Sequence, residues 1–286
     1  MSYIQAYQTY IERKKVFFDE KSGLEYSLFG NGEKVILALL GNNLLGSDAY
    51  FKTIEGLSEK YRVLTFLSRT KHQTVEQIAD DISILLTSLN ISKVNILGIS
   101  IGGAVAQVFA KHYPNQTESI MLYQTFAHTN VMDDEALAVK EEILTVIAQL
   151  EELRKQVSLE NIKMAQIYQI EEMLGDDLVD DTEDALDLFK YLMIDYTEDD
   201  EKRVMGLLKG FLENTIIKKE DLSFLTNKTL YIYDSEERAF GGLAMDDALL
   251  DIIPDAKAVS LDLDKFLIIL EANELVRIIV EFMDQI

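Results

Sequence analysis

A short glycine-rich segment carries the clearest chemical signal in the chain. It reads Gly98-Ile99-Ser100-Ile101-Gly102-Gly103 and follows an apolar run typical of a buried strand. This GxSxG spacing predicts a sharp strand-to-helix turn that exposes the Ser100 hydroxyl as a nucleophile. Such a hydroxyl attacks a carbonyl only when a neighbouring base, usually a histidine late in the chain, accepts its proton. The last of the three histidines is His128, so a nucleophile is present without a base in the expected place.

Composition and spacing exclude several other kinds of reactive site. The sequence has no cysteine, which rules out disulfides, thiolate metal sites, iron–sulfur clusters and cysteine nucleophiles. No His/Asp/Glu cluster has metal-ligand spacing, and no GxGxxG or GxxxxGK loop indicates a nucleotide site. The segment from Glu171 to Glu201 holds 14 acidic residues against the single basic Lys190, without the DxDxDG spacing of a calcium loop. We predict no cofactor and no metal, and we interpret the acidic segment as a solvated helical face.

Charge and hydropathy narrow the range of partners. The formal net charge is -23, which disfavours binding to nucleic acid or to anionic membrane surfaces. No apolar run approaches the roughly 20 residues that span a bilayer, and the N-terminal segment lacks the features of a secretory signal. At 286 residues and 48% hydrophobic content the chain can bury a large core. These observations predict a soluble cytoplasmic protein with a small-molecule partner, and they indicate no particular oligomeric state.

A mostly parallel sheet is expected to position Ser100. Three interior runs, VILALL, VNILG and SIMLY, are apolar on both faces, as is typical of parallel strands covered by helices on either side. Strand and helix patterns alternate through the first 125 or so residues and return near the end, which predicts an α/β fold. The expected strands are Lys15–Phe18, Leu24–Leu28, Val35–Leu40, Arg62–Phe66, Val94–Leu97, Ser119–Tyr123, Thr229–Tyr233 and Ala258–Leu261.

Helical patterns fill most of the remaining chain. The segment 74–90 opens with a Thr-x-x-Gln capping box and repeats apolar residues at helical spacing. A second helix begins within the Ser100 turn and continues until Pro114. Residues 131–220 read as consecutive acidic amphipathic helices without strand patterns. This arrangement predicts an α/β core formed by 1–130 and 221–286, with 131–220 inserted as a helical cap.

The first fourteen residues form a further amphipathic pattern. They place Tyr3, Ile4, Tyr7, Tyr10 and Ile11 on one face of a helix. We expect this helix to pack on the body of the protein through that face. The alternative is a face that binds a partner.

The order of these elements resembles the α/β-hydrolase fold, in particular its lid-bearing esterase, lactonase and thioesterase-like branch. The resemblance rests on YRVLTF followed by TVEQIADDISILLTSLNISKVNILGISIGGAVAQVFAKHYP, which has the spacing of the family's strand-helix-strand-elbow-helix unit. It covers nearly the whole chain. It implies a mostly parallel central sheet of about eight strands, helices on both faces, and an inserted all-helical lid.

The resemblance also implies roles for residues around the elbow. Ser100 matches the nucleophile, and the backbone N–H groups of Ile101 and Asn42 match the two donors of the oxyanion hole. The family usually has His-Gly where this chain has Leu40-Gly41. Backbone donors tolerate changes of side chain, so the oxyanion hole is expected to persist.

The acid of the triad is expected after the penultimate strand, in TLYIYDSEERAF. Alignment to the family's strand-Gly-x-x-Asp-Pro pattern places Glu237 at the acid and Asp234 at the glycine. Glu236 lies between them in the chain, and the sequence does not separate the three carboxylates by role. Glutamate can orient a histidine as aspartate does.

The base is where the chain departs most from the family. The segment LDLDKFLIILEAN resembles the Gly-His-Phe turn followed by Leu-Glu-Ala-Pro, and in that register Lys265 occupies the position of the catalytic histidine. Deprotonating an ordinary lysine at pH 7 costs about 4.6 kcal/mol. The nearby Asp262 and Asp264 favour the charged form of Lys265 and raise that cost.

Two hypotheses follow for function. The first is a degenerate triad with impaired or absent catalysis, in a protein that binds a small apolar ligand or a partner under its lid. The alternative is an active serine hydrolase of a carboxylic ester, lactone or thioester, with Lys265 or a displaced histidine as the base. His72 and His128 are the candidates for that displaced base, and with Leu40 and Asp234 they are the expected pocket residues.

Overall fold

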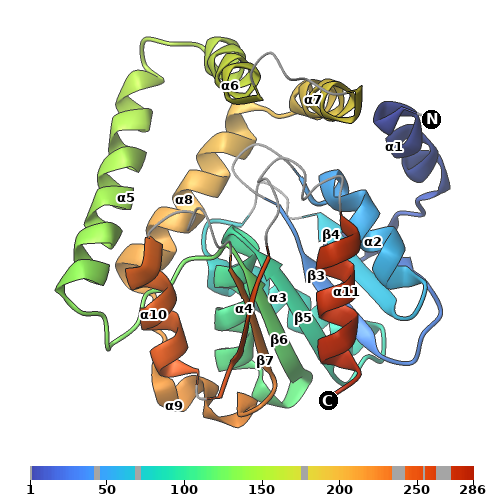
Figure 1. The fold of residues 1–286 in the computed structure, drawn as a ribbon. Coiled ribbons are helices and arrows are strands. Elements are labelled where there is room, and N and C mark those ends of the chain that lie inside the picture. Colours follow the sequence, from blue (N-terminus) through green and yellow to red (C-terminus); the bar gives the residue numbers. More distant parts are fainter. Residues whose placement is uncertain are drawn as a thin grey trace.

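The computed structural model describes residues 2–41, 46–67, 72–174, 180–233, 242–253, 255–261 and 272–286. Eight strands form a single sheet in the order β1-β2-β4-β3-β5-β6-β7-β8 (Figure 1). β2 is antiparallel to both β1 and β4, and every pairing from β4 to β8 is parallel. The strands are β1 Phe17–Asp19, β2 Leu24–Phe29, β3 Val35–Leu39, β4 Arg62–Leu67, β5 Val94–Ile99, β6 Thr117–Tyr123, β7 Thr229–Tyr233 and β8 Lys257–Ser260.

Each predicted strand is therefore present, with ends that differ from the prediction by at most two residues. The central strands are buried along their length: every residue of β3 and of β5 is buried. This confirms the interpretation of the doubly apolar runs as parallel strands covered on both sides.

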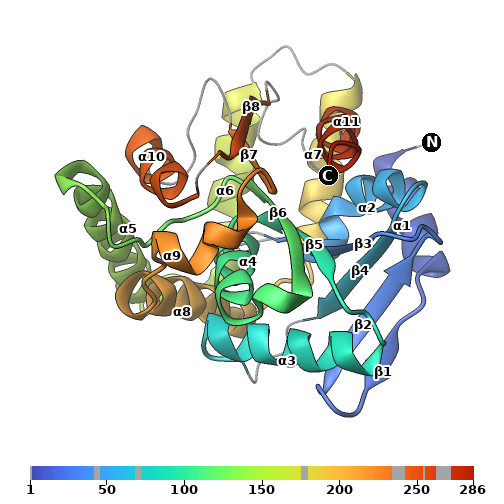
Figure 2. The ribbon, with the colours of Figure 1, turned by 90° about the horizontal axis from the view of Figure 1, so that it is seen from below.

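Helices cover both faces of the sheet (Figure 2). On one face lie α3 (Val75–Ser88) and α4 (Ile101–His112), which share a core cluster with Leu37 and Leu39 of β3. On the other lie α2 (Phe51–Ser58) and α11 (Ala272–Met283), which share a second cluster with Ile36 and Ala38. Neighbouring residues of β3 enter opposite clusters because side chains alternate across a strand. The predicted α/β architecture, a mostly parallel sheet of eight strands with helices on both faces, is confirmed.

The capping box predicted at the start of α3 is formed only in part. The Thr74 hydroxyl accepts a hydrogen bond from the Gln77 N–H at 3.3 Å, as an N-cap should. The Gln77 side chain, however, accepts from the N–H of Gln73 at 2.8 Å, one residue before the position that a capping box uses. Only the first half of the predicted box is therefore formed.

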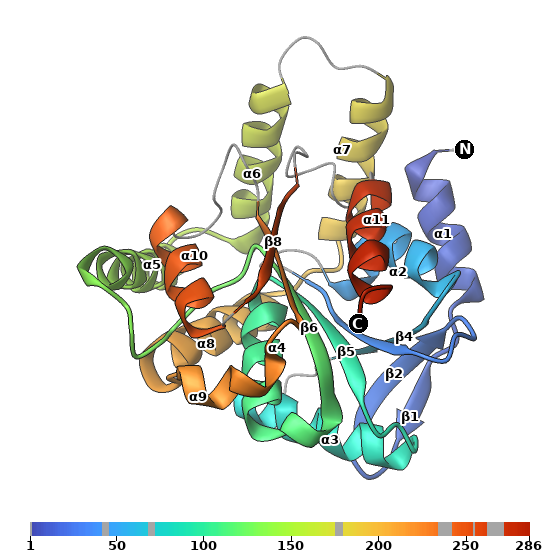
Figure 3. The ribbon, with the colours of Figure 1, turned by 60° about the horizontal axis from the view of Figure 1, so that its bottom comes forward.

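A block of helices connects β6 to β7 along the chain, although the two strands are neighbours in the sheet. It comprises α5 (Asp134–Leu153), α6 (Leu159–Leu174), α7 (Asp180–Met193) and α8 (Glu198–Asn214), and it is followed by α9 (Lys219–Leu222). Figures 1 and 3 place α6 and α7 beyond one end of the sheet. The described part of 131–220 consists of these helices and their connections, with one isolated β-bridge between Thr129 and Ile217. The division into a core and a cap remains a prediction. In the chain, α10 (Gly242–Ile252) follows β7 and precedes β8. Short 3-10 turns occupy Ser47–Tyr50, Pro114–Gln116 and Ser223–Leu225.

The N-terminal helix α1 (Tyr3–Arg13) packs on the body of the protein, as expected. Tyr10 is buried, and the ring of Tyr7 meets that of Tyr191 of α7 edge-on, with centroids 6.1 Å apart. The backbone N–H of Tyr3 donates to Asp184 of α7 at 2.9 Å. Ile11 departs from the prediction, because it is 39% exposed. It lies one residue beyond Tyr10, about 100° around the helix, and so falls outside the packed face.

Among the described residues, no helix is both long enough and apolar enough to cross a membrane.

Candidate active site

Ser100 lies on a strained turn between β5 and α4, as the GxSxG spacing predicts. Its backbone has φ 55° and ψ -124°, a region that residues other than glycine rarely adopt, and the residue is 4% exposed. The turn is held from both sides: the N–H of Ser100 donates to the Tyr123 carbonyl at 3.1 Å, and its own carbonyl accepts from the Thr125 hydroxyl at 2.8 Å. These bonds tie the elbow to the end of β6.

Three glycines around Ser100 are required by close packing. A Cβ on Gly102 would lie 1.9 Å from the carbonyl oxygen of Leu39, and one on Gly98 would lie 2.7 Å from the Cα of Gly103. A Cβ on Gly103 would lie 2.1 Å from the Thr125 hydroxyl oxygen. Each distance is too short for any side chain, so the glycines let α4 approach β3, β5 and the end of β6.

Of the two predicted oxyanion donors, the structure describes one. Ile101 is the first residue of α4, where backbone N–H groups have no partner within the helix. Asn42 lies outside the described residues. Of the two residues before it, Leu40 is buried and Gly41 has φ 144°. The Leu40 carbonyl accepts a hydrogen bond from the Ser47 hydroxyl at 2.7 Å.

The predicted acid and base also lie outside the described residues. Asp234, Glu236 and Glu237 fall within 234–241, and Lys265 falls within 262–271. The two segments start from neighbouring strands, since the N–H of Leu261 donates to the carbonyl of Tyr233 at 2.8 Å. The roles of these four residues remain predictions.

His72 is held by a carboxylate of α3. Its Nε2 lies 2.8 Å from Oδ2 of Asp81, and the residue is 3% exposed. His72 lies three residues before the start of α3, so this contact joins the segment that leads into the helix to the second turn of the helix. His112, the third histidine of the chain, is exposed in the last turn of α4.

His128 is buried against the C-terminal end of α8. Its Nδ1 lies 3.2 Å from the carbonyl oxygen of Phe211, and its own carbonyl accepts from the N–H of Ile217 at 2.8 Å. Burial lowers the pKa of His128, and the positive charge of Lys140 lowers it further. The ring therefore joins the segment that follows β6 to the C-terminal end of α8.

This environment predicts a pH-dependent stability. A free histidine has a pKa of about 6.5, so below that pH the unfolded chain binds a proton that folded His128 resists, and unfolding becomes easier. The contribution is fully present above pH 6.5 and is lost as the pH falls through the lower pKa of the folded state. We expect His128→Gln to lose less stability than the unsubstituted chain between pH 7.5 and pH 5.5, measured by urea unfolding. His112→Gln is the control, and an equal loss in all three proteins would contradict the prediction.

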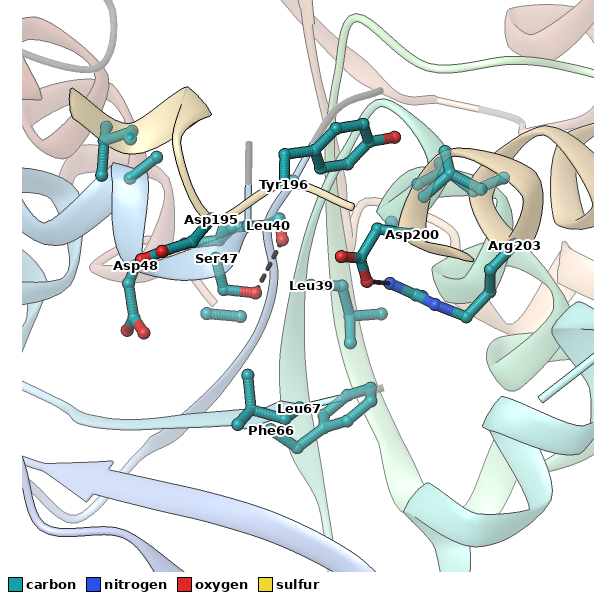
Figure 4. Close-up of a pocket in the computed structure, with 18 of the residues that line it drawn as sticks. Leu39, Leu40, Ser47, Asp48, Phe66, Leu67, Asp195, Tyr196, Asp200 and Arg203 are labelled. Atoms are coloured by element: carbon teal, nitrogen blue, oxygen red, sulfur yellow. Dashed lines mark hydrogen bonds and ion pairs between the residues drawn. The ribbon is translucent and has the colours of Figure 1, made fainter. Parts of the chain in front are cut away.

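A cavity of about 340 Å³ adjoins the elbow (Figure 4). Ile101 and Gly102, the two residues after Ser100, line it, as does Leu40, one of the predicted pocket residues. Neither His72 nor His128 is among the described residues that line it. The wall combines the ends of β3 and β4 with residues of α1, α3, α4, α7 and α8. Its large apolar side chains include Leu39, Leu40, Phe66, Leu67, Ile78, Ile101, Val105, Leu192, Val204 and Leu207.

Several polar residues of this wall were not predicted from the sequence. Tyr7 comes from α1, Asp195 and Tyr196 from the connection between α7 and α8, and Asp200 and Arg203 from α8. The aromatic face of α1 marked Tyr7 as a packing residue, but no local pattern indicated that it reaches a cavity. In the part of the chain that the structure describes, no group of three or more His, Cys, Asp or Glu residues could hold a metal ion.

Comparison with known proteins agrees with this architecture. A family model described as alpha/beta hydrolase fold matches residues 35–176. A 3-oxoadipate enol-lactonase of Acinetobacter baylyi is 28% identical over 139 residues, which are 44% of this chain and 51% of that protein. A putative carbamate hydrolase of Agrobacterium fabrum is 26% identical over 116 residues, or 37% of this chain and 44% of that protein. The chain thus matches about half the length of these relatives.

Solved structures extend the likeness to almost the whole chain. A hydrolase from Pseudomonas aeruginosa superposes with a TM-score of 0.67, covering 95% of this chain and 98% of that one at 18% identity. A likeness at this identity concerns the fold alone. Taken with the strand order and the elbow at Ser100, these matches lead to one conclusion: the chain is an α/β-hydrolase-fold protein.

Proposed function

We propose that this protein keeps the serine elbow of the fold but has a degenerate triad, so that catalysis is impaired and the cavity beside Ser100 serves to bind a small apolar ligand. The position of the histidines carries this proposal. All three lie within the described residues. Nε2 of His72 is 2.8 Å from Asp81 and Nδ1 of His128 is 3.2 Å from the Phe211 carbonyl oxygen, and neither residue is among those that line the cavity beside Ser100. His112 is exposed at the end of α4.

Lys265 is a poor replacement for the missing imidazole. It stands in the sequence between Asp264 and Phe266, and three residues after Asp262. Carboxylates this close in the chain stabilise the ammonium form, and an ammonium accepts no proton. In the proposed state the Ser100 hydroxyl therefore remains protonated and unreactive, because loss of the base costs a serine enzyme on the order of 10^6 in turnover.

The cavity supports the binding role. A volume of about 340 Å³ is within the range of small-molecule sites, and the described residues that line it are mostly apolar, with a few polar groups among them. The wall contributed by Leu192, Val204 and Leu207 comes from α7 and α8. We therefore propose that 131–220 acts as a lid whose inner face completes the pocket.

The alternative is an active serine hydrolase, and the intact elbow favours it. In that case the Ser100 oxygen attacks the carbonyl carbon of an ester or lactone and expels the alkoxide, which takes up the serine proton through a base. Water then releases the acyl group from the serine. An enol-lactonase and a putative carbamate hydrolase among the relatives suggest an ester-like carbonyl as the substrate class.

Reaction with a fluorophosphonate probe separates the two. We expect labelling of Ser100 at pH 7 to be at least 100-fold slower than in a serine esterase with an intact triad, because no base removes the serine proton. Intact-mass spectrometry over time measures the rate, and Ser100→Ala gives the background. Rapid stoichiometric labelling that depends on Ser100 would overturn the degenerate triad and establish the hydrolase.

A further inference from the structure

The charges around the cavity are unevenly distributed. Among the described residues, four charged side chains line it: Asp48, Asp195, Asp200 and Arg203. Asp200 lies 3.3 Å from Arg203, so these two compensate each other on one side. In Figure 4 this pair faces Asp48 and Asp195, which lie together on the opposite side. The cavity therefore has a neutral polar side and a side with two carboxylates.

Only one of those two carboxylates is neutralised. The Nζ of Lys14, whose side chain is 9% exposed, contacts both oxygens of Asp48 at 2.8 and 2.6 Å, and the Tyr10 hydroxyl donates to Asp48 at 3.0 Å. Asp195 has no ion pair within the described residues. Counting the described residues, one negative charge thus remains at this end of the cavity, in a protein whose net charge is already -23.

Aromatic rings stand beside the same carboxylates. Tyr7 of α1 and Tyr191 of α7 line the cavity, with centroids 6.1 Å apart and planes at 71°. The ring of Phe51 packs edge-on against that of Tyr7, with centroids 5.7 Å apart. Burial, and then the charges of Asp48 and Asp195, raise the pKa of Tyr7 to about 12, so both carboxylates act on this phenol. An aromatic face next to a carboxylate attracts a cation through its quadrupole and through charge.

We propose that the cavity takes a small cationic amine, whose ammonium group lies between Tyr7, Tyr191 and Asp195 and whose apolar part lies along Leu40 and Leu67. This inference rests on the proposed binding role of the cavity, and it narrows the small apolar ligand to one that carries a single ammonium group. The charge of Asp195, which is an exposed residue at this end, disfavours an anionic ligand. A neutral ligand of the same shape fills the cavity but gains nothing from the charge.

Three probes of matched shape test the inference: choline, its neutral isostere 3,3-dimethylbutan-1-ol, and the anion 3,3-dimethylbutanoate. The chain has no tryptophan, so Leu192→Trp places a single fluorescent reporter in the cavity wall. We expect choline to bind at least tenfold more tightly than the alcohol, and the anion to bind most weakly. Isothermal titration of the unsubstituted chain checks that the reporter has not changed this order.

Two charge variants distinguish a local site from the overall charge of the protein. Asp195→Asn is expected to weaken choline binding about tenfold and to leave the alcohol unaffected. Asp199→Asn removes the same charge from an exposed residue outside the cavity, and choline should bind it as it binds the unsubstituted chain. Tyr7→Leu tests the ring, with an expected loss of at least fivefold for choline alone.

The outcomes separate this inference from the proposed function. Equal binding of choline and the alcohol, or equal effects of the two aspartate variants, overturns the cationic ligand and leaves a cavity that binds apolar molecules. No response to any probe overturns it as well. The state of the triad is read independently, by the fluorophosphonate reaction at Ser100.

Discussion

Replacing Lys265 by histidine is expected to raise esterase turnover at least 100-fold. This position is predicted to correspond to the catalytic base, the elbow at Ser100 is formed, and Ile101, the predicted first oxyanion donor, begins α4. A histidine with a pKa of about 6.5 is largely neutral at pH 7.5 and can accept the serine proton, which a lysine ammonium cannot. Restoring a base can recover part of the roughly 10^6 that its loss costs. Release of nitrophenolate from p-nitrophenyl acetate provides the measurement.

Two further variants establish the cause of any gain. Lys265→Gln removes the positive charge without supplying a base, so its turnover should stay at the background level. Ser100→Ala combined with Lys265→His should abolish the gain, because the nucleophile is then missing. An unchanged rate in a folded Lys265→His protein would contradict the prediction and would indicate that the acid near Glu237 has been lost as well.

Gly102→Ala is expected to destabilise the fold by about 3 kcal/mol or more. The added methyl group would lie 1.9 Å from the carbonyl oxygen of Leu39, and that atom belongs to the backbone of a fully buried strand. Neither β3 nor α4 can move away without breaking the contacts of the sheet on both sides. Urea unfolding followed by circular dichroism measures the loss, and Ser100 should also become less reactive because its turn is displaced.

Gly206 offers a matched control for the same substitution. It lies within α8, is exposed, and a Cβ there would meet nothing within 4 Å. Since alanine is a better helix former than glycine, Gly206→Ala should stabilise the protein by about 0.5–1 kcal/mol. The two variants are therefore predicted to have opposite signs. A mild effect at Gly102 would mean that the elbow tolerates a side chain and that its glycines are not required by packing.

Local patterns accounted for most of the fold. The eight strands, the helix capped by Thr74 and the turn at Ser100 each depend on residues close together in the chain, through the alternation of a strand, the period of a helix or the small size of a glycine. The capping box failed at Gln77 for an equally local reason, since its side chain bonds Gln73 one residue too early. The sequence therefore predicted an element correctly where the contacts that determine it lie within a few residues of the chain.

The environment of the candidate site depends on contacts between distant residues. His128 meets Phe211, 83 positions later, and Tyr7 reaches the cavity because α1 packs against Tyr191 of α7. Amphipathic periodicity shows which face of a helix is buried, but it does not show which element buries it. The residue types near Ser100, and the absence of a histidine after His128, are facts of the sequence alone. Which side chains share the cavity, and which charges cancel within it, follows only from how the helices pack around the end of the sheet.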